Sequence, residues 1–366
     1  MASAPAAPPS QPVSAKARKF PCGACGADVL WNPGTSALKC PYCGNESPLP
    51  TSADAIRERS LEEGLRAPRE LGWGAERKAV RCQKCGATTT LEPNVAASSC
   101  AFCGTPAVVE APLDGNMVRP EGLLPFAVDR NSAVGKFRQW ISGLWLRPND
   151  LKQKSEVSTL RGVYVPFWTF DALTHSRWTA EAGYRYQVPV QALVNGKPTT
   201  RMETRIRWEP AAGFLELPFD DLPVPGSKGL DASLARAIEP FPTGGLVPYD
   251  PRYLSGFLAE EYAVALEEAA HRARARMQEE VDGACSREVP GDTQRNLQVT
   301  TAFSGVAYKN ALLPVWIAAY QYGGKPFRFL VNGVTGKVSG HAPFSAVKVT
   351  LLVLAILAVL FVLMNR

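Results

Sequence analysis

The sequence has little of the chemistry on which enzymes most often rely. It contains only three histidines, His175, His271 and His341, and none of them stands in a recognisable catalytic motif. A Walker A loop, which cradles nucleotide phosphates, is absent. The nearest segment, Gly333–Lys337, is too short and follows Asn332 as a hairpin turn would. We therefore expect no ATP-driven motor and identify no catalytic constellation.

Long apolar runs are missing until the end of the chain. Residues 1–19 are rich in Ala, Pro and Ser and lack the apolar stretch of a secretory signal, so we expect a disordered N-terminus. Residues 344–366, in contrast, carry Lys348 as the only charge before Met364. A helix from Val347 to Met364 would measure about 27 Å, close to a hydrocarbon core of about 30 Å. We expect a C-terminal membrane anchor, with Lys348 reaching the headgroups; the alternative is a buried core helix.

The cysteines, by contrast, follow a regular and repeated spacing. Eight of the nine cysteines form two identical frames, each with two C-x-x-C pairs around a spacer of 14 residues, and a glycine follows every pair. A C-x-x-C-G knuckle wraps backbone around a metal ion, with glycine taking the turn that a side chain would obstruct. Two knuckles per frame predict a tetrahedral four-sulfur site. The predicted metal ligands are Cys22, Cys25, Cys40 and Cys43 in the first frame, and Cys82, Cys85, Cys100 and Cys103 in the second.

Thiolate ligands in tetrahedral geometry favour Zn²⁺ at both sites, and iron in a rubredoxin-like site is the chemical alternative. A site closed by four cysteines leaves no position for water or substrate, so we expect two structural zinc ions. Each frame is too short to bury a core, and metal binding must supply most of its folding free energy. Cysteines spaced for metal also indicate a reducing compartment, which places the bulk of the chain in the cytoplasm.

The paired knuckles resemble tandem zinc ribbons, which also occur in transcription and replication factors. Together with three further stretches they are similar to a bacterial family of double zinc-ribbon membrane proteins. Those stretches are LLPFAVDRNSAVGKFRQWISGLWLRP (123–148), GVYVPFWTFDA (162–172) and LLPVWIAAYQYGGKPFRFLVNGVTGKVSGHAPFS (312–345). Members are often labelled primosomal-helicase-like, and some are linked to SPFH (flotillin-like) and phage-shock-type membrane-stress systems. The resemblance implies a partner of that kind, whereas the missing Walker A loop rejects the helicase label.

Motif positions and composition divide the chain into six parts and predict an α+β fold with an antiparallel sheet. A polar linker separates the two frames, and a larger domain begins after the second. The predicted parts are a disordered N-terminus at 1–19, zinc ribbon 1 at 20–46, a linker at 47–75, zinc ribbon 2 at 76–108, an α+β domain at 120–343 and a single transmembrane anchor at 344–366.

Within residues 120–343, two helices are expected. One is capped by Asn131 or Ser132 and ends before Pro148, and a longer one with a buried apolar stripe runs from about Leu254 to Cys285.

Strands and turns occupy much of the rest. GVYVPFWTFDAL and LLPVWIAAYQY are apolar strand-like runs, and the alternation in RMETRIRW (201–208) predicts a half-buried strand. Asn195-Gly196 and Gly323-Gly324 are hairpin turn signals. Pro166 and Pro314 lie inside strand-like runs, which favours edge strands or bulges at those positions.

Other candidate residues have simpler explanations. Cys285 is the one cysteine outside the frames, and it falls on the apolar stripe of the long helix, so a buried thiol is favoured over a nucleophile. Asp220 and Asp221 could form an acid–base pair, but adjacent side chains of an extended segment point to opposite sides. We therefore interpret PFDDLPVPG as a loop.

Three functions remain open. We favour a non-enzymatic adaptor in the cytoplasmic membrane that recruits a protein partner through its zinc ribbons. A membrane-tethered nucleic-acid binder is the alternative, because basic residues cluster at the second frame. Against it, Trp31 and Trp73 are the only tryptophans near the frames, too few for a stacking platform. An enzyme in the α+β domain lacks a visible site. The basic cluster comprises Arg77, Lys78, Arg81 and Lys84.

Overall fold

A computed structural model describes residues 20–49, 56–66, 78–91, 100–103, 105, 108–111, 120–151, 160–194, 197–322 and 325–364. The expected disordered N-terminus (1–19) lies outside these residues, as does most of the expected linker. The described part is an α+β structure dominated by one large sheet that combines antiparallel and parallel pairs. The predicted α+β class is therefore correct, and the sheet is mixed.

Among the described residues, twelve strands form the large sheet, and its path runs β11-β8-β13-β9-β12-β6-β5-β7. Most pairs are antiparallel, but β12 pairs β9 and β13 pairs β8 in parallel. Four more strands join this path at β9, β13 and β14. The bounds are β4 Arg59–Ser60, β5 Lys78–Cys82, β6 Thr88–Leu91, β7 Val108–Ala111, β8 Gly122–Leu123, β9 Arg161–Val194, β10 Lys197–Pro225, β11 Val247–Pro248, β12 Leu258–Glu260, β13 Thr293–Tyr322, β14 Lys325–Asn332 and β15 Val338–Gly340.

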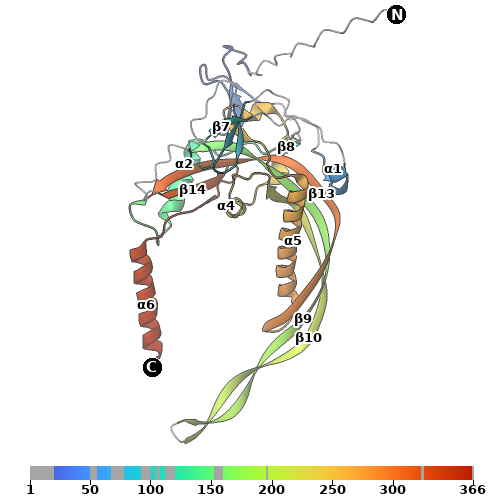
Figure 1. Ribbon diagram of the computed structural model, residues 1–366, viewed down its shortest axis with the longest axis vertical. Coiled ribbons are helices and arrows are strands. Elements are labelled where there is room, and N and C mark those ends of the chain that lie inside the picture. The colour runs from blue at the N-terminus through green and yellow to red at the C-terminus, as the bar shows by residue number, and fades with distance from the viewer. Residues whose placement is uncertain are drawn as a thin grey trace, which may run out of the picture.

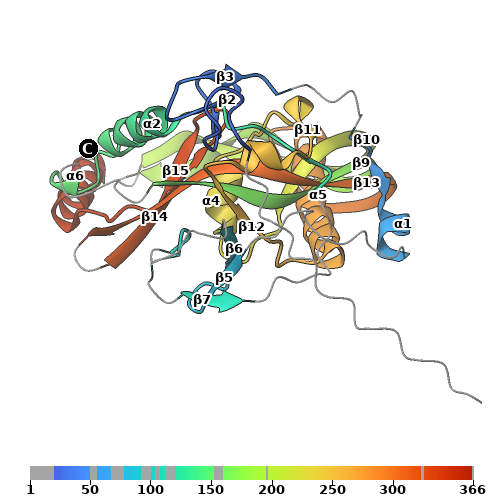
Figure 2. The same cartoon turned by 90° about the horizontal axis from the view of Figure 1, so that it is seen from above.

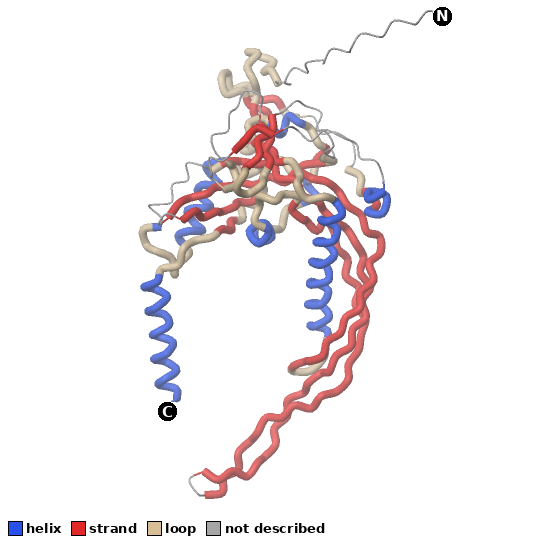
Figure 3. Tube along the Cα trace, viewed as in Figure 1, coloured by secondary structure: helices blue, strands red, loops and turns tan. Residues whose placement is uncertain are grey.

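Three very long strands give the molecule its shape. β9, β10 and β13 contain 34, 29 and 30 residues, and they curve together around helix α5 (Leu266–Glu288), which packs along their concave side (Figures 1 and 3). At about 3.3 Å per residue, β9 alone extends for about 110 Å. Val194 pairs with Lys197 and Tyr322 with Lys325, as expected for hairpins, although the two turn dipeptides themselves lie outside the described residues.

Helix α5 is shorter than the sequence pattern predicts. The expected helix from Leu254 is instead a 3₁₀ turn (η2, Pro251–Leu254) followed by strand β12, and the α-helix begins only at Leu266. Gly256, with φ of +86°, lies between the two and turns the chain out of a helical path. Most of the remaining apolar stripe is confirmed, since Leu266, Ala273, Met277, Val281 and Cys285 are buried. Ala270, expected on the stripe, is half-buried, and Ala269 is buried beside it.

The two strand prolines lie at neither sheet edges nor bulges. β9 is paired on both sides near Pro166, and so is β13 near Pro314. On one side, however, each strand passes from one partner strand to the next at this point, and the proline lies in the gap between the two partners. β9 passes from β12 (to Tyr164) to β10 (from Phe167), and β13 passes from β8 (to Leu312) to β14 (from Val315). The missing N–H of each proline therefore interrupts no ladder.

The far end of the β9–β10 hairpin is a two-stranded arm. β13 begins opposite Gly183, so the described residues of 184–207 pair only between β9 and β10, with no third described strand beside them. Met202 and Ile206, expected on a buried face, are 53% and 40% exposed. The alternating pattern correctly predicts the strand but not its burial, because the arm projects beyond α5 and no layer covers it (Figure 3).

The remaining described elements surround the centre of the sheet. Helix α2 begins at Arg130 because Asp129, rather than Asn131 or Ser132, caps it: its carboxylate accepts hydrogen bonds from both of their backbone N–H groups. The short segment 56–66 of the expected linker lies on the sheet, since β4 pairs with β13. The helical bounds are α1 Leu61–Arg66, α2 Arg130–Ser142, α4 Ala232–Ala237, η1 Thr243–Gly245 and α6 Ala346–Met364.

Candidate metal centres

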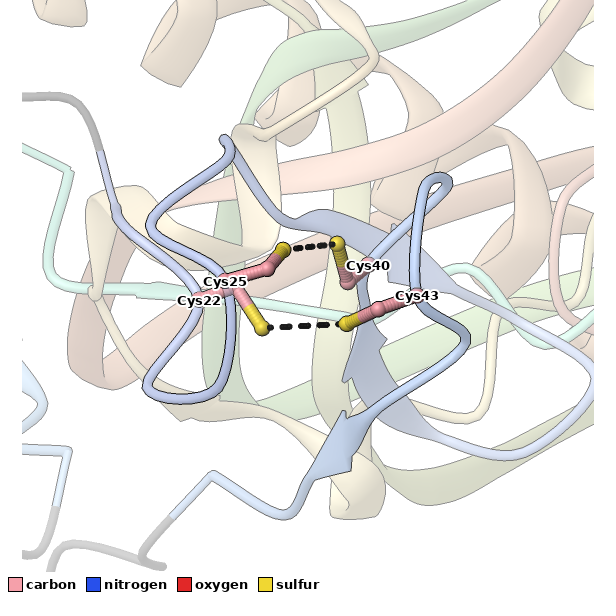
Figure 4. A group of neighbouring side chains, drawn as sticks. All are labelled: Cys22, Cys25, Cys40 and Cys43. Carbon is pink, nitrogen blue, oxygen red and sulfur yellow. Dashed lines mark hydrogen bonds between the residues drawn. The ribbon is translucent and has the colours of Figure 1, made fainter.

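The structure brings all eight predicted ligands together in two separate groups. In the first group, Cys22, Cys25, Cys40 and Cys43 have their sulfur atoms within 4.8 Å of one another, and the same holds for Cys82, Cys85, Cys100 and Cys103. Figure 4 shows the first group, in which the four sulfurs converge from two loops. We call the segments that carry them unit 1 (residues 20–46) and unit 2 (the described residues of 76–108).

The sulfur separations fit a tetrahedral metal site. Cys22–Cys43 and Cys25–Cys40 are 3.6 and 3.5 Å apart in unit 1, and Cys82–Cys103 and Cys85–Cys100 are 3.5 and 3.7 Å apart in unit 2. A zinc–sulfur bond of about 2.3 Å requires tetrahedral edges of about 3.8 Å. A disulfide would need sulfurs about 2.0 Å apart. Both groups therefore have the spacing of metal ligands rather than of disulfide-bonded cysteines.

Backbone geometry explains why the knuckles contain glycine. In the three knuckles whose glycine is described, the glycine N–H turns back to the first cysteine: Gly26 donates to the carbonyl of Cys22 at 2.9 Å, and Gly86 to that of Cys82 at 3.0 Å. Gly26 and Gly86 have φ of +74° and +76°. This left-handed conformation favours glycine, as the sequence pattern predicts.

Backbone amides also favour the thiolate form. The N–H groups of Ala24 and Cys25 lower the pKa of Cys22 to about 6, and the N–H of Cys43 lowers the pKa of Cys40. Thiolates are the form that binds metal. In unit 1 the first cysteine of each knuckle is thus favoured as a thiolate, whereas the neighbouring sulfur of Cys40 raises the pKa of Cys25.

Unit 1 carries a small three-stranded sheet with the following segment, β1 (Leu30–Asn32), β2 (Ala37–Lys39) and β3 (Glu46–Ser47), and it docks through the side that carries Trp31. Trp31 is 5% exposed, donates its indole N–H to the carbonyl of Phe126 at 3.1 Å and packs on Tyr253 with ring centroids 4.7 Å apart. One side of the cysteine group stays open, because Cys25 and Cys43 are exposed while Cys22 and Cys40 are buried.

Unit 2, in contrast, docks with three of its four cysteines buried. Its strand β6 extends the large sheet through β12, and Cys82, Cys100 and Cys103 are buried. Phe102, between the last two cysteines, is 1% exposed within the same core cluster as Leu230. The two units lie on opposite flanks of β9 and β13 (Figure 2). The duplicated sequence therefore attaches to the domain through two different surfaces.

Outside the units, Cys285 is a buried thiol, as predicted. It is 0% exposed, packs with Trp178 and Val281 on the inner face of α5, and burial raises its pKa. Neither property suits a nucleophile.

One arrangement that the sequence did not reveal involves His175. Its Nδ1 lies 2.9 Å from Glu216 and its Nε2 lies 3.3 Å from the hydroxyl of Ser304, which is the connectivity of a serine–histidine–acid triad. The three residues come from β9, β10 and β13, so no local motif could signal them. However, Glu216 is 70% exposed, and a triad acid orients its histidine effectively when it is buried. We interpret the contacts of His175 with Glu216 and Ser304 as polar contacts across an exposed face of the sheet.

A second unforeseen feature is a polar cluster where two neighbouring strands bulge. β10 bulges between Phe219 and Leu222, and β13 between Ser304 and Ala307, on either side of Asp171 in β9. Asp221, with φ of +51°, donates its backbone N–H to Asp171 at 2.7 Å and pairs with Lys309 at 2.8 Å. Asp221 is thus a bulge residue within a strand rather than part of a loop, which corrects the sequence interpretation.

Helix α6 is long and apolar enough to cross a membrane, and none of its residues is buried. We expected the side chain of Lys348 to reach the headgroups of a membrane. Its ammonium instead donates to the carbonyls of Trp145 and Arg147 at 2.8 and 2.9 Å and to the side chain of Asn149 at 2.7 Å. The base of α6 is therefore fastened to the loop after α2, beside a cavity of about 720 Å³.

Comparisons with known proteins give one relative. No family model matches the chain, and no solved structure matches it. The uncharacterised protein YdjG of Bacillus subtilis (strain 168) is 26% identical over 334 residues, which cover 90% of this chain and 91% of YdjG. The similarity thus extends over most of both chains, and the name of that protein states no activity.

Proposed function

We propose that this protein is a membrane-anchored adaptor. Helix α6 would insert into the cytoplasmic membrane, the remainder would lie in the cytoplasm, and the two cysteine units would each hold a structural Zn²⁺ and recruit a protein partner. In line with the family resemblance, the partner would be an SPFH-type or membrane-stress protein.

The observation that carries the proposal is the placement of the units relative to α6. Both units lie at the end of the molecule from which α6 points away (Figure 1). An inserted α6 would hold one end of the domain at the membrane and leave unit 1 accessible. Its exposed cysteines Cys25 and Cys43 lie at that accessible end.

The chemistry of the units supports a structural metal. Four cysteines complete a tetrahedral shell, so a bound ion has no open position for a substrate. Unit 1 is too small to form a core of its own, and a metal would fix its loops while its outer surface remains free. A surface that is rigid and exposed suits protein recognition, because little conformational freedom is lost on binding.

The cytoplasmic orientation is supported by two properties. Cysteines that are to bind metal need a reducing compartment. Lys337, before α6, and Lys348, in the first turn of α6, agree with the excess of positive charge on the cytoplasmic side of membrane helices.

A nucleic-acid binder is the second candidate, and one feature favours it. The two-stranded arm carries Arg185, Arg201, Arg205 and Arg207, all exposed, against the single acidic Glu203. Paired basic strands can contact phosphates. In unit 2, Arg81 and Lys84 are exposed as well, whereas Arg77 and the side chain of Lys78 lie outside the described residues.

A pull-down of the tagged full-length protein from detergent-solubilised membranes, with and without nuclease, distinguishes the two. The adaptor predicts a protein partner that survives nuclease treatment and disappears in the Cys22→Ser/Cys25→Ser variant. Cys285→Ser is the matched control, because that thiol lies in neither unit. Co-purification of nucleic acid, with all proteins lost on digestion, would establish the second candidate instead.

A further inference from the structure

The two cysteine units are copies of one sequence pattern offset by 60 residues, so each residue of unit 1 has a counterpart in unit 2. Their second knuckles read CPYCG and CAFCG, which makes Tyr42 the counterpart of Phe102. The two aromatic side chains have opposite environments. Phe102 is 1% exposed, whereas Tyr42 is 83% exposed.

The surroundings of Phe102 show how such a knuckle binds a protein surface. Ala101 and Cys103 on either side of it are 8% and 7% exposed, and Ala87 of the first knuckle is 1% exposed. Ala87 and Phe102 face Gly229, where an added Cβ would approach the Cβ of Ala87 at 2.4 Å and the ring of Phe102 at 3.3 Å. The aromatic ring thus occupies an apolar site, and the glycine allows the two backbones to approach closely.

In unit 1 the equivalent surface is free. Pro41, Tyr42 and Cys43 are all exposed, because unit 1 docks through Trp31 on its other side. Zinc-bound knuckles hold their backbone rigid, so Tyr42 is presented in a fixed place. Rigid, exposed tyrosines are among the residues that dominate the energy of protein interfaces.

We propose that the second knuckle of unit 1 is the docking surface of the adaptor, and that Tyr42 inserts into an apolar pocket of another protein as Phe102 inserts beside Gly229. This inference rests on the proposed adaptor function and names the surface through which it acts.

Two differences between the copies indicate the chemistry of the partner. Tyr42 carries a hydroxyl that Phe102 lacks, so the partner pocket supplies a hydrogen-bonding group at its base. Unit 1 is acidic, since Asp28 and Glu46 outnumber Lys39 and four thiolates with Zn²⁺ add a formal charge of −2. The pocket therefore has a basic rim, and a nucleic acid or an anionic lipid surface would be repelled.

The test uses the full-length protein in cells. The photocrosslinker p-benzoylphenylalanine is placed at position 42 and, as a control, at position 214, where Phe214 is also exposed (76%) but lies on β10. Mass spectrometry of the crosslinked peptides identifies what touches each position. We expect position 42, and not position 214, to crosslink to one protein, at a site with small apolar residues and a basic rim.

The crosslinked protein is then purified, and its binding to the detergent-solubilised chain is measured by calorimetry. We expect Tyr42→Ala to weaken binding at least about thirtyfold, as for an interface hot spot. Loss of the hydroxyl alone in Tyr42→Phe should weaken it about fivefold. Phe214→Ala should leave it unchanged, and equal zinc content in all variants excludes unfolding.

Crosslinks from position 42 only to a second copy of this chain, to lipid or to nucleic acid would overturn the inference, as would no crosslink at all or unchanged binding by Tyr42→Ala. If a protein partner is recovered by pull-down but is insensitive to Tyr42, the docking surface is wrong and the adaptor function stands. If no protein partner is recovered, the adaptor function itself fails.

Discussion

Corresponding cysteines in the two units differ mainly in their exposure to solvent. Cys25 and Cys43 of unit 1 are exposed, while Cys85 of unit 2 is half-buried and Cys103 is buried. A chelator or thiol reagent must reach the sulfur atoms in order to remove a metal. The two sites have identical ligands, so we expect them to differ in the rate of metal release rather than in the metal that they prefer.

We predict that zinc leaves the protein in two phases under a mercurial thiol reagent, with unit 1 emptied first. The release can be followed with a chromogenic zinc indicator. In Cys22→Ser the fast phase should disappear, and in Cys82→Ser, its counterpart 60 residues later, the slow phase should disappear. A single phase of two equivalents, or the opposite assignment, would contradict the exposure argument.

Asp171 gives a pH prediction at the bulged part of the sheet. Burial raises the pKa of Asp171 to about 6, against a value of about 3.8 without burial. The folded protein then binds this proton more tightly than the unfolded chain does. The contribution of Asp171 to stability is therefore present below about pH 4 and is lost as the pH rises through about 6.

The variant Asp171→Asn keeps an oxygen that accepts the backbone N–H of Asp221 but cannot ionise. Its melting temperature relative to the wild type should rise between about pH 4 and pH 6 and then level off. Thermal unfolding of both proteins across this range measures the difference. If the difference between the two melting temperatures instead stayed constant from about pH 4 to pH 6, Asp171 would not titrate in this window.

Among the secondary-structure elements, the strands show most clearly what the sequence could and could not predict. Local patterns correctly predict the knuckles, α2, most of α5 and the strands around Pro166 and Pro314, since each depends on neighbouring residues. The partners of those strands depend on residues far along the chain. The prolines were therefore assigned to edges or bulges, when in fact they fall in the gaps between successive partners.

The docking of the units is another long-range property. Trp31 contacts Phe126 and Tyr253, and Phe102 lies against Gly229, so no short segment contains both sides of either contact. Knowledge of the duplication alone suggests two similar attachments. The different exposed residues, Tyr42 in one and Arg81 in the other, became visible only with the fold.

Gly229 should be required for the docking of unit 2. In Gly229→Ala the new methyl group would meet the Cβ of Ala87, which has no flexible end that could move away. We expect a loss of about 1–3 kcal/mol in stability, as is typical of overpacking, together with faster zinc release from unit 2 only. Gly244→Ala is the control, because no atom lies within 4 Å of its added Cβ. Equal effects of the two substitutions would refute the close contact.

At the scale of the whole molecule, α6 points away from both cysteine units (Figure 1). Strands β9 and β13 run through the centre, the two units lie on their opposite flanks, and α6 starts beside α2 and runs in the same direction as α5 and the β9–β10 arm (Figures 1 and 2). Lys348 fixes the base of α6 to the loop after α2 through three hydrogen bonds. Attachment of α6 to a membrane would therefore also position the domain and the free knuckle of unit 1.

The most direct test of the adaptor account is the location of the partner protein in cells. The partner found by pull-down is quantified in membrane and soluble fractions of cells that express either the full-length chain or a chain that ends at residue 343. The account predicts that the partner follows the adaptor, in the membrane fraction with the full chain and in the soluble fraction with the shortened one. Equal zinc content confirms that the shortened chain is folded. A partner that stays at the membrane with either chain would contradict the account, because recruitment would then not depend on this protein.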